Sequence, residues 1–503
     1  MSTTVSETVR TADGERTVVA RLLAVLTGVR LLLWSGMACF TLGFAVLSVL
    51  RHDAFNTGRF DLGNMVQAVW STAHGHPLRM TSLDGDQISR LAAHVDPILA
   101  VFAPLWLLWP SPDMLVTAQA LLVALGALPV FRLARKHVGS ERAALGFALA
   151  YLLQPAVQWL ALNEFHPVAI AAPALLFAFW WLDEGRLAPF AVAALVACLS
   201  KEEIPLAVCG MGLWYALSRR QWRPGLLIAA AGLAWALVAV EVVIPHFNAG
   251  AGSEFLARYG EVGGSPAGIL KTAFTHPVLL LEKAFGHRGI HYMLELALPL
   301  GVLWALSPLA LLIALPDLAL NVLSQNTLQS SIHFHYTAGI IPGVVAATVL
   351  GSGRLVRARP QWPQLAGLLG TAMVVLSIAA NWNLGAIPFW REVWRGERLG
   401  AWDTHVSAHD RTADRVLRRV PGDAVVSATN SLGAHLSGRR RILSFPRILD
   451  ATWIAVDETK LSTYDRLVAL PSAERLVKLR RDPAWRLVAS EDGILLFERR
   501  AGA

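Results

Sequence analysis

The sequence predicts an all-α polytopic membrane bundle followed by a small polar domain of α/β structure. Hydrophobic residues make up 54% of the 503 residues and charged residues only 16%. Several apolar runs reach the ~20 residues that a helix needs to cross a bilayer. The runs are continuous rather than alternating, which excludes a transmembrane β-barrel. From residue 381 the composition becomes polar, so a second domain is expected to begin there.

We expect about eleven transmembrane helices between residues 31 and 380. The first run, 31–50, is expected to stay as a signal anchor, because the residues before it are too charged for a cleavable signal peptide. Residues 1–30 then form a cytoplasmic segment. The apolar segment 97–109 is too short for a span and suits a re-entrant or interfacial helix. The further spans are expected near residues 114–131, 143–161, 167–182, 187–200, 204–217, 225–244, 292–306, 309–323, 337–350 and 363–380.

Basic loops indicate the orientation of this bundle. With a cytoplasmic N-terminus, loops 132–142, 219–223 and 354–359 all fall on the cytoplasmic side, as the positive-inside rule requires. The first external loop is then 51–113, and residues 381–503 form an extracytoplasmic domain. The net charge of +8 follows from this topology and does not indicate a nucleic-acid partner.

The external domain is expected to combine helices and strands around a modest core of its own. The three cysteines of the chain, Cys39, Cys198 and Cys209, all lie in apolar runs. The polar domain therefore has neither a disulfide framework nor a cysteine-type zinc site. Its helices are expected near 410–420 and 473–480, its strands near 424–428, 441–444 and 453–457, and a hairpin pairs 485–489 with 494–498.

The first external loop contains a short amphipathic helix with Asp61 at its start. A carboxylate held in water at the membrane surface is a candidate for acid–base chemistry. The alternative is an interfacial helix that only packs against the bundle. Apolar residues recur at the spacing of one buried helical face, at Leu62, Met65, Val66, Val69 and Trp70.

Polar residues from four external segments are expected to gather at the outer leaflet. Charged residues at span ends beside short turns are costly to bury and are functional candidates by default. Three of the groups also have a structural alternative: turn capping for the second, a snorkelling ion pair for the third, and a hydrogen-bonded histidine pair for the fourth. The groups are Asp61, His94 and Asp96; Glu164 and His166; Lys201 and Glu202; and His333, His335 and Tyr336.

The order and spacing of these features resemble a known family. They resemble the GT-C superfamily of polyprenyl-phosphate-sugar-dependent glycosyltransferases and, more narrowly, the bacterial membrane family named domain of unknown function 2079. The resemblance covers most of residues 50–500. The segments that carry it are Phe60-Asp-Leu-Gly63, His94-Val-Asp-Pro-Ile-Leu99, Leu133-Ala-Arg-Lys-His-Val-Gly139, Glu164-Phe-His-Pro167, Lys201-Glu202, Phe334-His-Tyr336 and Ser427-Ala-Thr-Asn-Ser-Leu-Gly-Ala-His435.

The resemblance implies an integral enzyme of the bacterial plasma membrane that works outside the cytoplasm. Such enzymes transfer a sugar from a polyprenyl-phosphate donor to an acceptor, which would be a cell-envelope glycan, a lipid or a protein. The superfamily's functional acid lies in the first external loop, and Asp61 is the matching position. Many members hold a divalent ion near that loop, which here would be Mg²⁺ or Mn²⁺ bound by Asp61, His94 and Asp96; no organic cofactor is implied. The sequence departs from the pattern because no second acid adjoins Asp61.

We expect a hexosyl- or pentosyltransferase in which Asp61 is the general base on the acceptor hydroxyl. A single displacement would invert the anomeric carbon, whereas a double displacement would use Glu164 or Glu202 as a second carboxylate. The donor's tail would lie among membrane lipid, with segment 97–109 lining its groove. Positive charge is needed beside the leaving phosphate. The candidate donor-phosphate-binding residues are Glu164, His166, Lys201, Glu202, His333, His335 and Tyr336.

Two other functions remain open at this point. A transporter or flippase of a lipid-linked substrate would explain Glu295, an acid inside an expected span. It also predicts polar residues along the spans toward both faces, whereas here they cluster on one side. A non-catalytic assembly protein predicts that Asp61→Asn has no effect on product formation.

Overall fold

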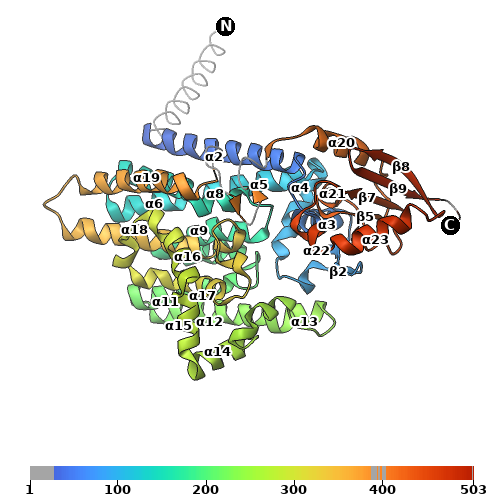
Figure 1. Cartoon of the computed structure of the whole chain (residues 1–503). Helices are drawn as coiled ribbons and strands as arrows, with labels where there is room; N and C mark the ends of the chain where they lie inside the picture. Colours follow the sequence, from blue (N-terminus) through green and yellow to red (C-terminus); the bar gives the residue numbers. More distant parts are fainter. Residues whose placement is uncertain (1–27, 387–392, 395–396, 399–403, 501, 503) are drawn as a thin grey trace, which may run out of the picture.

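The computed structural model describes residues 28–386, 393–394, 397–398, 404–500 and 502. A body of helices makes up most of the molecule, and a smaller α/β domain from the C-terminal part lies at one of its ends (Figure 1). Helix α2, Gly28–Asp53, runs along one side of the body and ends beside this domain. A mostly helical membrane body with a small mixed α/β domain is the fold class that the sequence predicts.

Five helices of the described residues are long and apolar enough to cross a membrane. A sixth crossing results if α7 (Glu141–Leu153) and α8 (Pro155–Leu162), which meet at a bend of 50°, form one span. The bend falls at Pro155, which has no N–H for the helical ladder. The five are α2, α5 (Pro112–Leu125) continued by α6 (Ala127–Val138), α12 (Trp222–Val238) continued by η5 (Ala239–Val243) and α13 (Ile244–Phe247), α18 (Ile340–Ala358) and α19 (Leu365–Leu384).

The expectation of about eleven spans is therefore supported only in part. Three of the expected spans, 167–182, 187–200 and 204–217, are helices that fall short of the length that a crossing needs. These shorter helices are η4 (Pro167–Ile170) with α9 (Ala171–Asp183), α10 (Leu187–Cys198) and α11 (Ile204–Arg219).

The two spans expected between residues 292 and 323 are broken into short pieces. Pro299, Pro308 and Pro316 each lie in the first turn of one piece, where the missing N–H is tolerated, and none could continue a preceding helix. Hydropathy alone does not register these interruptions. The pieces are α16 (His287–Ala297), η7 (Leu298–Leu300), η8 (Leu303–Leu306), η9 (Pro308–Ile313) and α17 (Leu315–Leu323).

Small residues allow the closest helix contacts in the body. A Cβ built on Gly146 of α7 would lie 2.4 Å from the carbonyl oxygen of Gly370 of α19. Gly212 of α11 and Gly225 of α12 approach each other in the same way. Close backbone approach through small residues is typical of helix packing in membranes, where burial of apolar surface gives no driving force.

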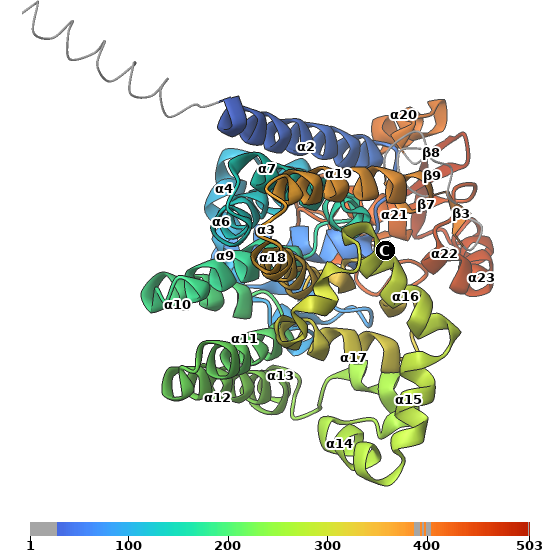
Figure 2. The same cartoon turned by 90° about the vertical axis from the view of Figure 1, so that its left-hand side faces the viewer.

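The segment between α13 and α16 projects from the main body (Figure 2). It contains η6 (Glu254–Val262), α14 (Pro266–Thr275) and α15 (Pro277–Phe285). After α17, the chain makes two short 3₁₀ turns, η10 (Thr327–Ser330) and η11 (His335–Thr337), before α18 begins. These turns bring the expected histidine segment beside η6, as the contacts described below show.

The loop of residues 51–113, which is expected to be external, is compact. Its amphipathic helix is present as η1 (Arg59–Gly63) followed by α3 (Asn64–Ala73), and Leu62, Met65, Val66 and Val69 are buried as their spacing predicts. The segment 97–109 forms η3 (Pro97–Phe102) and α4 (Ala103–Leu108), which leave several large apolar side chains exposed, as expected for contact with lipid. Between them lie β1 (Arg79–Thr81), β2 (Gln87–Ser89) and η2 (Arg90–Ala92).

The C-terminal domain contains a five-stranded sheet in the order β6-β5-β7-β9-β8. The first three strands in this order are parallel, β9 pairs antiparallel with β7, and β8 pairs antiparallel with β9 at the edge. Every expected strand is present, and two short helices, α21 and α22, were not expected. The elements are α20 (Ala408–Leu417), β5 (Val426–Ala428), α21 (Asn430–His435), β6 (Ile442–Ser444), β7 (Trp453–Asp457), α22 (Thr463–Leu467), α23 (Ala469–Leu479), β8 (Trp485–Glu491) and β9 (Ile494–Arg499), besides the short strands β3 (Val393–Trp394) and β4 (Glu397–Arg398).

The C-terminal domain docks on the first external loop through a buried arginine. Arg59 of η1 is 1% exposed, and its guanidinium donates to Ser444 Oγ at 2.9 Å and to the carbonyl oxygens of Thr81 and Ile442 at 2.7 and 2.9 Å. Gly433 of α21 allows this contact, because a Cβ there would lie 2.8 Å from the Arg59 Cβ. The domain is therefore joined to the turn that contains Asp61.

The loops expected to be cytoplasmic meet at the other end of the body. Asp183, whose side chain is fully buried, accepts from Lys136 Nζ at 2.6 Å and from His137 Nε2 at 2.9 Å, and it also pairs with Arg219. Arg357 donates to the His137 carbonyl oxygen at 3.2 Å. Loops that the sequence assigns to one side are thus gathered together, away from the loops that hold Asp61.

Candidate active site

Asp61 lies in η1, at the point where the loop of residues 51–113 meets the helical body. Its side chain is 50% exposed, and its Oδ1 is 3.6 Å from Nε2 of His166. The surrounding protein raises the pKa of this carboxyl by desolvation, but the contact with His166 and the charges of Arg90 and Arg258 outweigh this and hold the pKa below its ordinary value. Asp61 is therefore ionised at neutral pH and reachable from solvent, as a general base must be.

Glu164 fixes the backbone on both sides of Asp61. Its two carboxylate oxygens accept from the Gly58 N–H at 3.0 Å, and Oε2 also accepts from the Leu62 N–H at 2.9 Å. Burial, and then the charge of Asp61, raise the pKa of Glu164 to about 7, against the lowering effect of these N–H groups. Glu164 was expected among the phosphate ligands, but its carboxylate is engaged in positioning η1.

The C-terminal domain holds the same turn from the opposite side. The Oδ1 of Asn430, at the start of α21, accepts from the Phe60 N–H at 3.0 Å. A Cβ on Gly63 would lie 2.5 Å from the Ser437 Oγ, so the turn and α21 are in close contact. The sequence segment Ser427–His435, which carries part of the family resemblance, thus packs directly against the turn of Asp61.

A row of rings leads from Asp61 into the body. His166 Nδ1 donates to the Glu164 carbonyl oxygen at 2.6 Å, which leaves Nε2 facing Asp61. The ring of His166 stacks on that of His335 with centroids 3.7 Å apart, and His335 in turn lies 4.2 Å from the ring of Tyr336. Burial, then the charges of His166 and Lys201, hold the pKa of His335 well below its ordinary value, so its imidazole is neutral.

Tyr336 borders a cavity of about 260 Å³ whose two ends differ in character. Lys201, Glu202, His94 and Arg258 lie at its polar end with Tyr336. Glu203 and Asp317 also line the cavity. The remainder of the lining is mainly apolar and comes from α11, α12, η5, η6, α14 and α17, with Leu206, Leu233, Leu237, Val240, Leu256, Ile269 and Leu320 among the lining residues. This combination of a charged end and an apolar remainder suits a lipid with a charged head group.

Lys201 and Glu202 are each engaged by neighbours at the polar end. Lys201 Nζ lies 2.7 Å from Glu203 and 5.4 Å above the centre of the Tyr336 ring. Glu202 accepts from His94 Nδ1 at 2.8 Å and from the Val95 N–H at 3.0 Å. Burial raises the pKa of Glu202. The charge and hydrogen bond of His94, together with the charge of Lys201, outweigh burial and lower this pKa to about 2.

Arg258 is the cationic residue of this cavity that the sequence did not single out. Its guanidinium lies 4.5 Å above the Phe255 ring, and its Nη1 is 3.5 Å from the Tyr336 hydroxyl. Among the described residues, no carboxylate lies within ion-pair distance of it. The sequence points to Arg258 only weakly, because it is one arginine in the amphipathic segment Glu254–Val262, where no span was expected.

The residues expected to hold a metal ion do not come together. Asp96 is almost fully buried and accepts from Nε and Nη2 of Arg90, both at 2.9 Å. His94 pairs with Glu202, and Asp61 faces His166. Within the described part of the chain, no three His, Cys, Asp or Glu side chains are arranged to hold a metal. The set of Asp61, His94 and Asp96 therefore does not fit a metal ion.

His333 does not join His335. Its Nδ1 is 2.8 Å from the Ser331 hydroxyl, and its ring packs edge-on against Trp159 with centroids 4.8 Å apart. The Asn163 side-chain amide donates to its carbonyl oxygen at 3.2 Å. Because His335 begins a 3₁₀ turn, the extended geometry that would place the two imidazoles on one face is absent.

Comparison with known proteins agrees with this architecture. The fold is similar to that of ArnT from Cupriavidus metallidurans in its structure bound to undecaprenyl phosphate, with a TM-score of 0.50 and 13% identity over 93% of this chain and 99% of that chain. The apo structure of the same protein matches with a TM-score of 0.50 and 13% identity over 88% of this chain and 93% of that chain. No curated protein sequence matches. The family model for DUF2079, described as a predicted membrane protein, matches residues 51–496, and the chain therefore belongs to this family.

Proposed function

We propose that this protein is a membrane glycosyltransferase that moves a sugar from a polyprenyl-phosphate donor to an acceptor hydroxyl outside the cytoplasm. The observation that carries the proposal is the link between the cavity and Asp61. The cavity offers cations at one end and an apolar lining elsewhere, and the rings of Tyr336, His335 and His166 connect its polar end to the carboxylate. The ArnT structure that contains undecaprenyl phosphate supports the same class of donor.

In this proposal the donor phosphate binds at the polar end of the cavity. Arg258 supplies positive charge without a competing carboxylate among the described residues, and Lys201 adds charge that Glu203 partly offsets. The prenyl tail lies along the apolar lining. Cations placed where negative charge develops on the leaving phosphate lower the barrier most effectively in a site that excludes water.

Asp61 acts on the acceptor. It takes the proton of the acceptor hydroxyl while the hydroxyl oxygen forms a bond to the anomeric carbon. The bond from that carbon to the phosphate oxygen breaks, and the electron pair leaves with polyprenyl phosphate. Glu164 is a poor second nucleophile, because backbone N–H groups engage both of its oxygens. We therefore favour a single displacement that inverts the anomeric carbon.

Asp61→Asn tests the proposal directly. The change keeps the size of a half-exposed side chain and removes the base, so transfer should fall about 10²- to 10⁴-fold while the protein still folds. The assay uses the full chain in nanodiscs with a panel of polyprenyl-phosphate sugars and mixed envelope acceptors. Asp86→Asn, an exposed position in the same loop, is the matched control. Undiminished transfer by Asp61→Asn, or no turnover of any donor by the wild type, would refute the proposal.

A further inference from the structure

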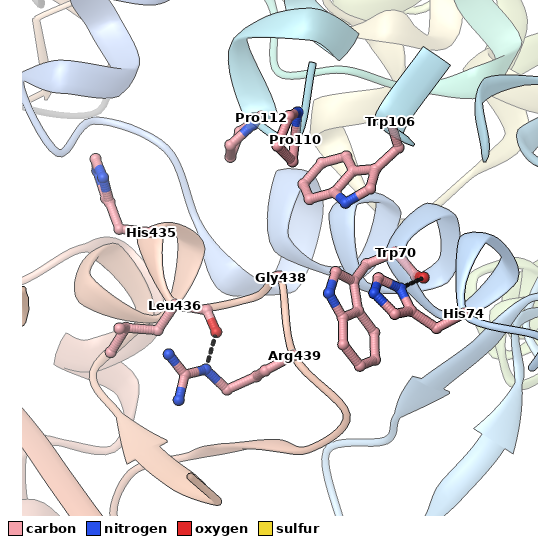
Figure 3. A pocket seen from close by; sticks show the side chains of 9 residues that line it. All are labelled: Trp70, His74, Trp106, Pro110, Pro112, His435, Leu436, Gly438 and Arg439. Atoms are coloured by element: carbon pink, nitrogen blue, oxygen red, sulfur yellow. Dashed lines mark hydrogen bonds between the residues drawn. The ribbon is translucent and has the colours of Figure 1, made fainter. Parts of the chain in front are cut away.

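A second cavity, of about 330 Å³, lies between the first external loop and the C-terminal domain (Figure 3). Its volume is in the range of small-molecule sites in proteins. Trp70, His74 and Trp106 form one side, and the C-terminal end of α21 with the segment after it forms another. None of the residues assigned above to donor binding or to acid–base chemistry lines this cavity, whose members are Trp70, His74, Trp106, Pro110, Pro112, His435, Leu436, Gly438 and Arg439.

Two indoles dominate this cavity, and their N–H groups are available to a ligand. Trp106 is 4% exposed, yet its Nε1 has no hydrogen-bond partner among the described residues and is not sealed from solvent. Trp70 is partly exposed, and its ring stacks on His74 with centroids 4.2 Å apart. An aromatic ring with a polar N–H at its edge matches a ligand that is apolar on one face and polar at its rim.

The lining of this cavity carries one permanent charge. Arg439 is the one lining residue with a permanent charge, and its guanidinium donates to the carbonyl oxygens of Leu436, Pro421 and Ala424 at 2.5, 3.0 and 3.0 Å. His435 is held by the His52 carbonyl oxygen and by stacking on Phe55, and burial keeps its pKa well below the ordinary value. Backbone carbonyl oxygens thus engage the His435 ring and two of the three Arg439 nitrogens, and Arg439 Nη2 remains as a donor.

We propose that this cavity binds one ring of a neutral saccharide. A hexose has an apolar C–H face that packs on an indole, and its hydroxyl oxygens accept from N–H groups at the rim of the ring. The two indoles supply both features. The site is separate from Asp61, and the proposal does not depend on the transfer reaction.

Gly438 provides a sharp way to block the site. A Cβ on Gly438 would already lie 3.4 Å from the Trp106 ring and 3.8 Å from Trp70, so a larger side chain must enter the cavity. Gly438→Leu fills the cavity without removing either indole. Trp70→Ala removes one indole, whereas Trp70→Phe keeps an aromatic face. Trp109→Ala is the matched control, because Trp109 is an exposed tryptophan of the same segment that does not line the cavity.

The experiment measures binding of maltotriose, cellotriose and mannotriose to the full chain in nanodiscs, by saturation-transfer difference NMR and calorimetry. Sugar-based detergents are avoided, and no donor lipid is added, so the result is independent of catalysis. We expect at least one of the sugars to bind, with a loss of about tenfold or more in Gly438→Leu and in Trp70→Ala, and near wild-type binding in Trp70→Phe and Trp109→Ala. No binding at millimolar concentration, binding that survives Gly438→Leu or Trp70→Ala, or an equal loss in Trp109→Ala would overturn the proposal.

Discussion

Asp61 and Glu164 are neighbouring carboxyl groups in different environments. Asp61 is half exposed and faces an imidazole, which keeps it ionised. Glu164 is enclosed behind η1, and its pKa is raised to about 7 by burial and by the charge of Asp61. Two carboxyl groups whose environments push their pKa values apart have separate roles. The exposed group serves the proposed chemistry, and the enclosed group positions it.

This difference predicts a pH dependence of stability that Glu164→Gln should reduce. The folded-state pKa of Glu164 lies above its ordinary 4.5. The contribution of this group to folding stability is therefore fully present below pH 4.5 and is lost as the pH rises through about 7. The loss is at most about 3 kcal/mol. Thermal melts from pH 4.5 to 7.5 should show the wild-type Tm falling relative to that of Glu164→Gln. Parallel curves would contradict this assignment.

Arg258 and Lys201 should respond differently to neutral substitution. Arg258 has no carboxylate partner among the described residues, so Arg258→Gln should leave the Tm nearly unchanged and raise the KM for the donor about 10- to 100-fold, the cost of one charged hydrogen bond. Lys201→Met leaves the mostly buried Glu203 unpaired and should lower the unfolding free energy by about 3 kcal/mol or more. Melts and donor titrations of both variants, with Arg258→Lys as the charge-preserving control, test this. An unchanged KM in Arg258→Gln would remove Arg258 from the donor site.

Among the elements, η1 connects the two domains. Glu164 of the helical body and Asn430 of the C-terminal domain each accept from its backbone, and Arg59 projects from it into the sheet edge at β6. The amphipathic helix α3 then continues from η1 and buries its apolar face. The position of Asp61 therefore depends on three separate parts of the chain.

Arg59→Met should loosen this junction. The change leaves buried oxygens of Thr81, Ser444 and Ile442 without their donor, and each such group costs about 1–3 kcal/mol. We expect a lower Tm and faster proteolysis at the boundary of the C-terminal domain, together with reduced transfer, because Asp61 is in the same turn. Arg79→Met, at an exposed arginine of the same loop, should change none of these. Equal behaviour of the two variants would show that the buried arginine is not what joins the domains.

On the scale of the whole molecule, the expected loops gather at two ends. One end holds η1, the histidine segment and the C-terminal domain, and the other holds Asp183 with its partners Lys136, His137 and Arg219. The expected alternation of loops along the sequence produces this separation.

Cysteine labelling should establish which end faces the cytoplasm. In a background without Cys39, Cys198 and Cys209, Asp414→Cys in α20 should react with a membrane-impermeant maleimide in intact cells. Arg359→Cys, exposed after α18, should react only after permeabilisation. Both positions are exposed, so accessibility within the fold does not distinguish them. The reverse pattern would place Asp61 in the cytoplasm and end the glycosyltransferase proposal.

The sequence by itself determined the features that depend on local pattern. Apolar runs predicted the helical body, the spacing after Asp61 predicted α3, and the change to a polar composition after residue 381 predicted the α/β domain. Charge in alternate loops predicted which segments would meet. It also identified Asp61, His166, His335 and Lys201 as polar residues of one region, because each lies in a segment expected on the same side of the membrane.

Only the tertiary structure decided how those residues are used. It added Arg258, turned His333 toward Trp159, and engaged His94 and Asp96 in pairs with Glu202 and Arg90. It also formed the aromatic cavity between two domains that are distant in sequence. Such outcomes depend on contacts across hundreds of positions, as between Arg59 and Ser444, which are 385 residues apart. Periodicity and spacing act over a few turns of helix, so they carry no information about partners at that separation.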